Sequence, residues 1–464
     1  MADPTPDDPV TQSLADDRND AVTVRPRILV IGCGFAGIEA VRLLSKAAVE
    51  ITLVDRTNHH LFQPLLYQVA TAGLSSTAIS APIRHILLPE MERGNLTVLK
   101  AEVRHIDVAA RTATLDGGDR LSWDHLIVAA GATQSYFGHD DWAAHAPGLK
   151  TLADALGIRA RIIGAYENAE RCADDAARAA WMTFVVIGGG PTGVEMAGTM
   201  SEIAQHTLLR EFRHIDSSRT RVVLLEGGDR VLAAFVPKLS QRAREQLDRL
   251  GVEVRLGSQV TEIDADGVSY DASHDGVKTS ERLACRTVIW AAGVAGSPLG
   301  ADIARGTGAR LDRAGRVVVE PDLSVPGHPT IWVVGDLAAA NSHGSGGPTP
   351  VPGVSPAAKQ MGRAVAKNLL RRMKGEPTQP FHYRDYGNLA TVGRKAAIVD
   401  LPVPGLGALR FSGLGAWLFW LFAHIYFLIG FRNRLMVMVE WAWAYFTYER
   451  SARVVAEPPS PGTP

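Results

Sequence analysis

Short apolar runs recur along the chain, each followed at once by glycine or by an acidic residue. The runs 27–31 and 183–187 lead into a G-x-G-x-x-G pattern, and the runs 50–54 and 221–225 end beside an acid. Runs of this length, rich in β-branched residues, predict buried parallel strands, and helical spacing follows each glycine pattern. The pattern therefore predicts an α/β protein built on two similar strand–turn–helix units.

The first unit has every part of a dinucleotide fingerprint. Its glycines permit a tight turn, a close backbone approach and packing of the following helix, and the acid about 20 residues later can bind a ribose hydroxyl. The helix N-terminus offers free N–H groups to a pyrophosphate. We expect the contacts to come from Gly32, Gly34, Phe35, Ala36, Gly37 and Asp55.

The second unit repeats this arrangement with a longer gap before its acid, where segment 207–220 is expected to hold extra helical turns. A carboxylate at the end of that strand favours NADH, because it would repel the 2′-phosphate of NADPH. Arg230 lies close in sequence and works against that preference. The expected contacts are Gly188, Gly190, Thr192, Gly193 and Glu226.

Three further predicted strands end in small residues, which let backbone pass close to a cofactor. Two end in Ala-Ala-Gly, and the third ends in Gly-Asp, where the acid either accepts hydrogen bonds from the sugar-alcohol chain of a flavin or caps a helix. Two dinucleotide units in one chain indicate a retained FAD and an exchanging nicotinamide dinucleotide. The expected contacts are Ala130, Gly131, Ala292, Gly293, Gly335 and Asp336.

Composition narrows the class of function. The chain has 464 residues and a formal net charge of −1, so no overall field attracts nucleic acid. Cys33, Cys172 and Cys285 are far apart, which argues against a disulfide framework or a metal site. They fit a reducing, cytosolic side of a membrane.

From residue 27 to 394 the chain resembles the two-dinucleotide-binding-domain flavoproteins of the pyridine nucleotide-disulfide oxidoreductase superfamily. Their disulfide reductases need a cysteine pair after the first fingerprint, and here no cysteine lies between Cys33 and Cys172. The segments 58-NHHLFQPLLYQVATAGL-74 and 188-GGGPTGVE-195 resemble type II NADH dehydrogenases more narrowly. That resemblance implies FAD, NADH and a membrane quinone, either ubiquinone or menaquinone.

The same resemblance implies roles for individual residues. Glu195 would lie near the flavin and nicotinamide, handling a proton or placing the nicotinamide; the alternative is a surface acid stabilised by the helix dipole. Lys395 would place a charge near the quinone, unless it is an exposed hairpin lysine. Further flavin contacts would come from Phe62, Gln63, Pro64, Gln68, Val103 and Ala357.

The quinone motif of the family, A-Q-x-A-x-Q, corresponds here to 355-SPAAKQ-360. Ala358 and Gln360 match, and Gln360 becomes the expected quinone contact. Pro356 replaces the first glutamine, and proline is favourable in the first turn of a helix.

The last part of the chain is hydrophobic and aromatic. An 18-residue helix over 414–431 would be about 27 Å long, just short of a hydrocarbon core of about 30 Å, and the run 435–450 is rich in Trp and Tyr. We expect a monotopic anchor lying in one leaflet; the alternatives are a span, a buried helical cap or a homodimer surface. His424 interrupts the first run, as a quinone contact or as a histidine bonded to nearby backbone.

These patterns predict two Rossmann-like domains plus a C-terminal helical membrane anchor. The FAD domain takes 24–160 and 300–385, the NAD domain 161–299 and the anchor 386–450, with disordered tails at 1–23 and 451–464. Strands 96–100 and 112–115 are expected in a small antiparallel sheet.

The predicted reaction passes a hydride from NADH to flavin N5 and two electrons on to quinone, without pumping protons, at the cytoplasmic face of the inner or cytoplasmic membrane. The alternatives are a protein or oxygen acceptor, or a redox sensor resembling apoptosis-inducing factor.

Overall fold

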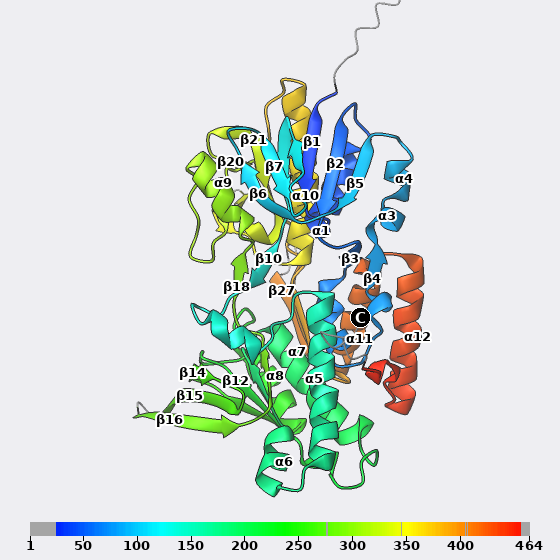
Figure 1. Ribbon diagram of the computed structural model, residues 1–464, viewed down its shortest axis with the longest axis vertical. Helices are drawn as coiled ribbons and strands as arrows, with labels where there is room; N and C mark the ends of the chain where they lie inside the picture. Colours follow the sequence, from blue (N-terminus) through cyan, green and yellow to red (C-terminus); the bar gives the residue numbers. More distant parts are fainter. Residues whose placement is uncertain (1–24, 275–276, 345, 404, 406, 456–464) are drawn as a thin grey trace, which may run out of the picture.

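The structure is a computed structural model that describes residues 25–455 apart from 275, 276, 345, 404 and 406. The tail predicted at 1–23, and the part of the C-terminal tail beyond 455, lie outside the described residues. Two α/β bodies are stacked along the long axis, and the C-terminal helices run along one side (Figure 1).

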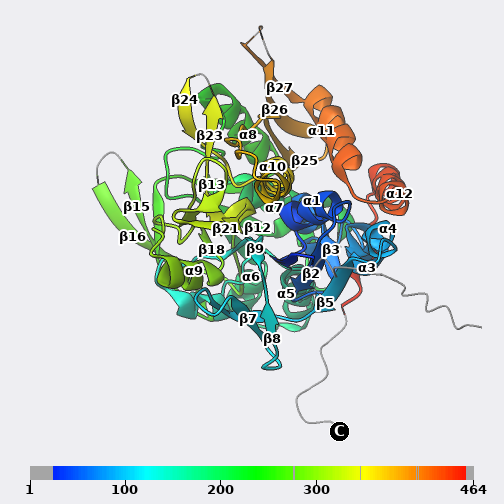
Figure 2. The same cartoon turned by 90° about the horizontal axis from the view of Figure 1, so that it is seen from above.

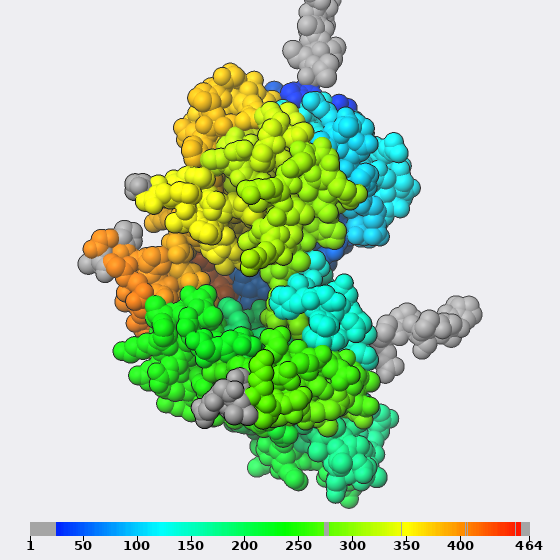
Figure 3. All heavy atoms as spheres, turned by 90° about the vertical axis from the view of Figure 1, so that its left-hand side faces the viewer, coloured from blue at the N-terminus to red at the C-terminus, as the bar shows by residue number. Residues whose placement is uncertain are grey.

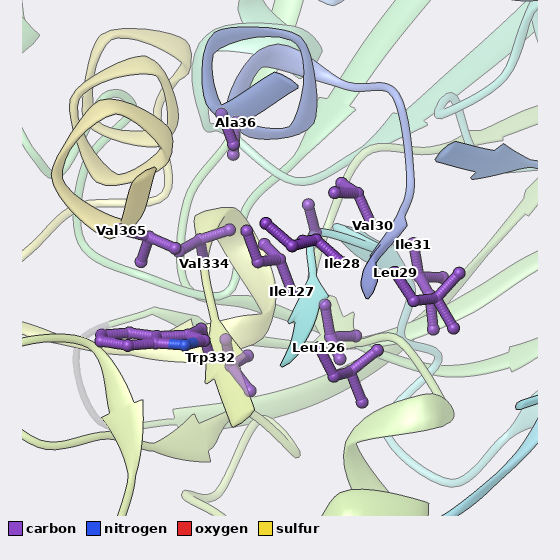
Figure 4. Packing of buried hydrophobic residues seen from close by; sticks show 14 of the residues in the cluster. Ile28, Leu29, Val30, Ile31, Ala36, Leu126, Ile127, Trp332, Val334 and Val365 are labelled. Atoms are coloured by element: carbon purple, nitrogen blue, oxygen red, sulfur yellow. The ribbon is translucent and has the colours of Figure 1, made fainter. Parts of the chain in front are cut away.

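The upper body contains a six-stranded sheet in the order β20-β21-β9-β1-β2-β5, parallel except for β20. Helices α1 (Phe35–Leu44) and α10 (Ser355–Met373) pack against each other, and their buried side chains join the apolar cluster of the sheet (Figure 4). The strands are β1 Arg27–Ile31, β2 Glu50–Asp55, β5 Leu96–Lys100, β9 His125–Val128, β20 Ser324–Val325 and β21 His328–Val333.

The lower body repeats the plan with a four-stranded parallel sheet, β13-β12-β11-β17, and a three-stranded antiparallel sheet, β14-β15-β16. Within 207–220, where extra helical turns were expected, the structure has the 3₁₀ turn Ser217–Arg219. A π-turn at Ile203–Thr207 precedes the segment and continues α7. The elements are α5 Leu152–Arg171, α6 Asp175–Trp181, β11 Thr183–Ile187, α7 Pro191–Glu202, β12 Arg221–Leu225, α8 Pro237–Arg249, β13 Val252–Arg255, β14 Ser258–Ile263, β15 Gly267–His274, β16 Val277–Ala284 and β17 Thr287–Trp290.

The third glycine of each fingerprint allows a helix to pack closely against its glycine turn, in both bodies. A Cβ on Gly37 would overlap the carbonyl oxygen of Gly32, and a Cβ on Gly193 would overlap that of Gly188. Helices α1 and α7 can therefore sit directly on their turns only because these positions lack a side chain. Both predicted strand–turn–helix units are confirmed.

One strand was assigned to the wrong sheet. Residues 112–115 form β7 (Thr112–Leu115) between β6 (Val103–Asp107) and β8 (Arg120–Ser122) in a small antiparallel sheet, as expected. Residues 96–100 instead form β5, which pairs in parallel with β2. Because β5 is an edge strand, its side chains alternate between buried and exposed, as they do in a half-exposed antiparallel sheet. Its sequence pattern therefore could not distinguish an edge strand of a parallel sheet from an antiparallel strand.

The C-terminal region forms a three-stranded antiparallel sheet and two helices that lie side by side at the edge of the molecule (Figure 2). The expected 18-residue helix was wrong: α11 ends after 14 residues, about 21 Å. The chain leaves α11 at Leu428, whose backbone is extended, and Gly430, at φ +87°, precedes the first residue of α12. Arg434 donates to the carbonyls of Tyr426 and Leu428. The elements are β25 Asn388–Gly393, β26 Ala396–Val403, β27 Gly407–Gly413, α11 Leu414–Phe427 and α12 Phe431–Thr447.

Within the described part of the chain, no helix combines the length and the apolar character needed to cross a membrane. The remaining elements connect the bodies or cover their edges. They include β3 His59–Leu61, α2 Leu66–Ala70, β4 Ser80–Pro82, α3 Ile83–Ile86, α4 Leu88–Met91, β10 Ala132–Gln134, β18 Val294–Gly296, α9 Leu299–Thr307, β19 Val317–Val318, β22 Ala338–Ala339, β23 Asn341–Gly344 and β24 Gly347–Pro350.

Candidate cofactor and substrate cavity

A cavity of about 1190 Å³ runs from the first glycine turn to helix α11. Figure 3 shows the surface hollowed between the two bodies. The predicted site residues that line this cavity are Gly32, Gly34, Phe35, Ala36, Asp55, Phe62, Gln63, Pro64, Val103, Ala130, Gly131, Thr192, Glu195, Gly335 and Asp336. Those outside its lining are Gly37, Gln68, Gly188, Gly190, Gly193, Glu226, Ala292, Gly293, Ala357, Gln360 and Lys395.

The acid of the first unit is held against its own glycine turn. One carboxylate oxygen of Asp55 accepts from the backbone N–H of Cys33 at 2.6 Å, and the other accepts from Thr57 N–H at 2.7 Å. Beside Gly34 the described residues leave open space where a side chain would stand. Cys33 is buried, and burial raises the pKa of its thiol, so this cysteine packs and does not react.

The opposite wall combines a glycine turn with a helix N-terminus. Gly335 has φ +71°, Asp336 follows it, and Val354 and Ser355 bring the start of α10 to the cavity. Pro356 occupies the first turn of α10, as predicted, so it costs the helix no internal hydrogen bond. The free N–H groups and the positive dipole end of this 19-residue helix meet the cavity and favour negative charge there.

The second glycine turn mirrors the first. Glu226 accepts from the backbone N–H of Gly189 at 2.5 Å and from that of Gly228 at 2.7 Å. Space beside Gly190 is open among the described residues, as it is beside Gly34. Arg230 donates to the carbonyl of Ala233, so it is engaged within its own loop. Each turn thus presents a carboxylate and an uncovered stretch of backbone.

Glu195 faces the cavity from α7 and is only 8% exposed, so the alternative of a surface acid was wrong. One of its carboxyl oxygens accepts from the backbone N–H of Thr391, in β25, at 3.3 Å. Burial holds the pKa of this carboxyl well above its usual range, and the Thr391 bond offsets only part of that shift. Burial therefore favours the protonated form of Glu195.

Tyr67 lies between this cavity and a second, smaller one of about 110 Å³. Gln68 lines the smaller cavity; its amide N–H donates to the Tyr67 hydroxyl at 2.9 Å, and its carbonyl accepts from Trp441 at 2.7 Å. Deeper in, the carboxylate of Glu202 is 3.5 Å from the guanidinium of Arg450. Gln68 therefore joins α2 to α12 and lies away from the main cavity.

Two predicted catalytic residues lie apart from the cavity. The side-chain amide of Gln360 donates to the Arg384 carbonyl and accepts from the Arg384 N–H, both at 2.9 Å. These two bonds hold α10 against the segment around Arg384. Lys395 stands in the β25–β26 hairpin with its Nζ 5.3 Å from the Tyr445 ring centroid of α12. Their roles at the quinone stay predictions.

Several residues in or beside the two cavities were missed from the sequence: Tyr67 lines both cavities, Thr391 lines the smaller one, and Lys359 packs outside the lining of either. Tyr67 and Thr391 gave no pattern of their own. Lys359 gave the best available signal, since it lies inside the quoted motif 355–360; its ammonium is 5.2 Å from the Phe35 ring centroid and 5.4 Å from that of Phe427. Burial lowers its pKa. This lysine joins the first glycine turn to α11.

The main cavity fits a flavin dinucleotide. It is long and continuous, it has open backbone at Gly34, a carboxylate at Asp55 for a ribose and a carboxylate at Asp336 for a polyol chain, and a helix N-terminus closes its far wall. These donors and acceptors are the kinds that pyrophosphate, sugar hydroxyls and an electron-accepting ring require.

Comparison with known proteins agrees with this geometry. The profile of the family described as pyridine nucleotide-disulphide oxidoreductase matches residues 26–362, and the NDH2 C-terminal domain matches residues 386–448. The chain is 44% identical over 439 residues to the type II NADH:quinone oxidoreductase Ndh of Mycobacterium tuberculosis, covering 93% of this chain and 91% of that protein. It is 43% identical to NdhA of the same organism, covering 96% and 92%.

Solved structures share the fold. The NDH2 of Plasmodium falciparum, determined in complex with NADH, superposes with a TM-score of 0.81 at 18% identity and covers 93% of this chain and 100% of that one. The sulfide:quinone oxidoreductase of Aquifex aeolicus gives a TM-score of 0.68 at 18% identity, covering 91% and 95%. The sequence matches, together with two dinucleotide units around one cavity, show that the chain belongs to the pyridine nucleotide-disulphide oxidoreductases and, within them, to the type II NADH:quinone oxidoreductases.

Proposed function

We propose that the chain is an FAD-dependent NADH:quinone oxidoreductase that does not pump protons. The observation that carries this proposal is the single cavity, which joins three features: the first glycine turn, the start of α7 below the second glycine turn, and the apolar helix α11. A bound flavin would accept a hydride from one side and pass two electrons to an acceptor on the other. The protein supplies position, charge and exclusion of water.

The first glycine turn and Asp55 would hold the nucleotide half of FAD, and Asp336 with the start of α10 would hold the polyol and ring. Gln63 and Pro64 line the same stretch of cavity, where the Gln63 amide donates to the Lys150 carbonyl at 3.2 Å. These assignments extend to Val103, Ala130 and Gly131, which line the cavity as well.

NADH would bind at the second glycine turn with its pyrophosphate on the open backbone at Gly190 and its adenosine ribose on Glu226. The carboxylate of Glu226 repels a 2′-phosphate, so NADH is preferred over NADPH. Thr192 and Glu195, one helical turn further along α7, reach the cavity and would meet the nicotinamide end. Protonated Glu195 can donate a hydrogen bond there or release a proton during quinone reduction.

A membrane-surface location follows from the exposed face of α11 and α12. On α11 the exposed side chains stand four residues apart and so share one face. The set is Leu414, Leu418, Phe422, Tyr426, Phe431, Leu435, Met438, Val439, Trp443 and Phe446. So large an apolar, aromatic surface fits a monotopic anchor in one leaflet. Since NADH is a cytosolic fuel, the bodies would face the cytoplasm. A homodimer would bury the same face.

For the domain organisation we propose an FAD domain in two pieces around an inserted NAD domain, followed by the anchoring region 386–450. The boundary expected at 160/161 falls within helix α5, so the division is better placed before Leu152, where that helix begins. Part of the expected C-terminal tail forms the 3₁₀ turn Ser451–Arg453, and Arg453 pairs with Glu211.

The test is steady-state reduction of a short-chain ubiquinone or menaquinone by the purified, detergent-solubilised protein with NADH. Release and chromatography of the bound flavin in the same preparation separates FAD from FMN. We expect stoichiometric FAD and NADH-dependent quinone reduction. Oxidation of NADH only by dyes, with no quinol formed, would overturn the proposal.

A further inference from the structure

Helix α11 contributes Ala423, His424 and Phe427 to the cavity wall, so the histidine is the polar side chain of that wall. Resting on the proposed quinone reductase function, we propose that His424 is the group that recognises the reduced product: its Nε2 accepts a hydrogen bond from a hydroxyl of the quinol.

The tautomer of His424 follows from its own helix. Its Nδ1 is 2.8 Å from the carbonyl oxygen of Trp420, one turn earlier. A carbonyl only accepts, so Nδ1 carries the ring proton, and in a neutral imidazole Nε2 then has only a lone pair. Nε2 has no hydrogen-bond partner among the described residues. The ring therefore offers an acceptor and no donor.

The ring is also fixed in place. The Trp420 indole stacks on it with the ring centroids 4.0 Å apart, and Phe62 meets it edge-on at 6.3 Å. Trp420 itself is buried, at 1% exposure. Since the Nδ1 bond and these two contacts oppose rotation about the side-chain bonds, Nε2 keeps one orientation. Burial lowers the pKa of His424 to about 4, so the ring stays neutral at physiological pH.

A neutral acceptor distinguishes the two states of a quinone. In the overall reaction, NADH gives up a hydride, which carries two electrons and one proton, and solvent supplies a second proton. Both C=O groups of the quinone become C–O single bonds and two O–H bonds form. A quinone carbonyl presents lone pairs, which the lone pair of Nε2 repels, whereas a quinol hydroxyl presents a proton. His424 thus stabilises the oxygen once it is protonated, and another group or solvent delivers that proton.

Two substitutions separate this role from packing. In His424→Asn the amide N–H lies near the Nδ1 position and can still reach the Trp420 carbonyl, but the Nε2 acceptor is gone. In His424→Gln an amide oxygen can occupy the Nε2 position. We expect the inhibition constant for a short-chain ubiquinol to rise by about 3- to 10-fold in H424N and by much less in H424Q. The flavin content and melting temperature of each variant report whether it folds.

A direct reading comes from ¹⁵N-histidine NMR of the wild-type holoenzyme, in which the His424 resonances are assigned by their loss in H424Q. We expect the Nε2 resonance to shift on addition of ubiquinol and not of ubiquinone. Equal ubiquinol inhibition of H424N and wild type, or an Nε2 resonance unmoved by ubiquinol, would overturn this inference while wild-type quinone reduction stands. A wild-type enzyme that forms no quinol overturns the proposed function itself.

Discussion

At the scale of single residues, the buried carboxyl of Glu195 ties the chemistry of the cavity to pH. Burial raises the pKa of this carboxyl. At a pH between the ordinary carboxyl pKa and the raised value, Glu195 is ionised in the unfolded chain and protonated in the folded protein. The unfolded state then binds fewer protons, and the stability contributed by Glu195 is complete at low pH and falls as pH rises to the raised pKa, by at most about 1.4 kcal/mol per pH unit.

Glu195→Gln should remove this slope. We expect the melting temperature of E195Q to increase relative to that of the wild type as pH increases from about 5 to about 8. Both proteins are measured in the same detergent and saturated with FAD. Glu92→Gln, at an exposed acid, serves as the control and should track the wild type. A melting-temperature difference between E195Q and wild type that is constant across this range would show that Glu195 does not titrate as described.

Glu226 should decide between the two nicotinamide cofactors. In Glu226→Gln the repulsion of a 2′-phosphate is lost, along with charge-assisted bonds to the turn and the ribose. We expect the ratio of kcat/KM for NADH over NADPH to fall by about tenfold or more, measured with the same quinone acceptor. Asp248→Asn, at an exposed acid of helix α8, is the control and should keep the wild-type ratio.

At the scale of elements, polar contacts bind α12 to the segment 75–80. Glu440 accepts from the N–H and the hydroxyl of Ser75, and Asn433 donates to the Ser80 carbonyl. Beyond the helix, Arg450 donates to the Thr71 carbonyl and faces buried Glu202. The hydrophobic C-terminal region is therefore bound to the segment 66–80, which starts at the main cavity with Leu66 and Tyr67.

Arg450→Met should break this attachment at its most buried point. It leaves the carboxylate of Glu202 without its partner, and such uncompensated buried charges cost about 3–5 kcal/mol. Burial also raises the pKa of Glu202, so protonation recovers part of that cost. We expect a clearly lower melting temperature for R450M, whereas Arg432→Met, at an exposed arginine of α12, should match the wild type. Equal melting temperatures for R450M and wild type would rule out the pairing as a fastening point.

The apolar face of α11 should decide membrane binding. Placing glutamates at Leu418 and Phe422, which are 55% and 66% exposed, puts two charges where we expect acyl chains. The double variant should float poorly with phosphatidylcholine–phosphatidylglycerol vesicles and still reduce ferricyanide with NADH. Leu311→Glu, at an exposed leucine of the upper body, is the control. Full flotation of the double variant would place the membrane contact elsewhere.

At the scale of the whole molecule, local sequence was sufficient for the two dinucleotide units and insufficient for how distant segments meet. Gly37 and Gly193 are required by a turn that each unit builds within a few residues, so the pattern alone located them. The contacts of Trp441 with Gln68 and of Thr391 with Glu195 join residues 373 and 196 positions apart. No local pattern encodes such pairs.

The sequence also misplaced features that depend on tertiary context. At the break after α11 the backbone becomes extended at Leu428, and Arg434 of the next helix donates to the Leu428 carbonyl, while the run of apolar residues suggested an unbroken helix. The positions of Gln360 and Lys395 also needed tertiary contacts: their side chains contact Arg384 and Tyr445, outside the lining of the main cavity, and their roles at the quinone stay predictions.

The central claim is that one cavity carries electrons from NADH to a quinone. The most direct measurement is anaerobic stopped-flow spectroscopy of the detergent-solubilised holoenzyme, reduced with one equivalent of NADH and then mixed with a short-chain ubiquinone or menaquinone. We predict that the flavin absorbance returns within the time of one steady-state turnover, with one quinol formed per flavin. A flavin that stays reduced for many turnover times in the presence of either quinone would contradict the claim and point to a protein acceptor or a sensor.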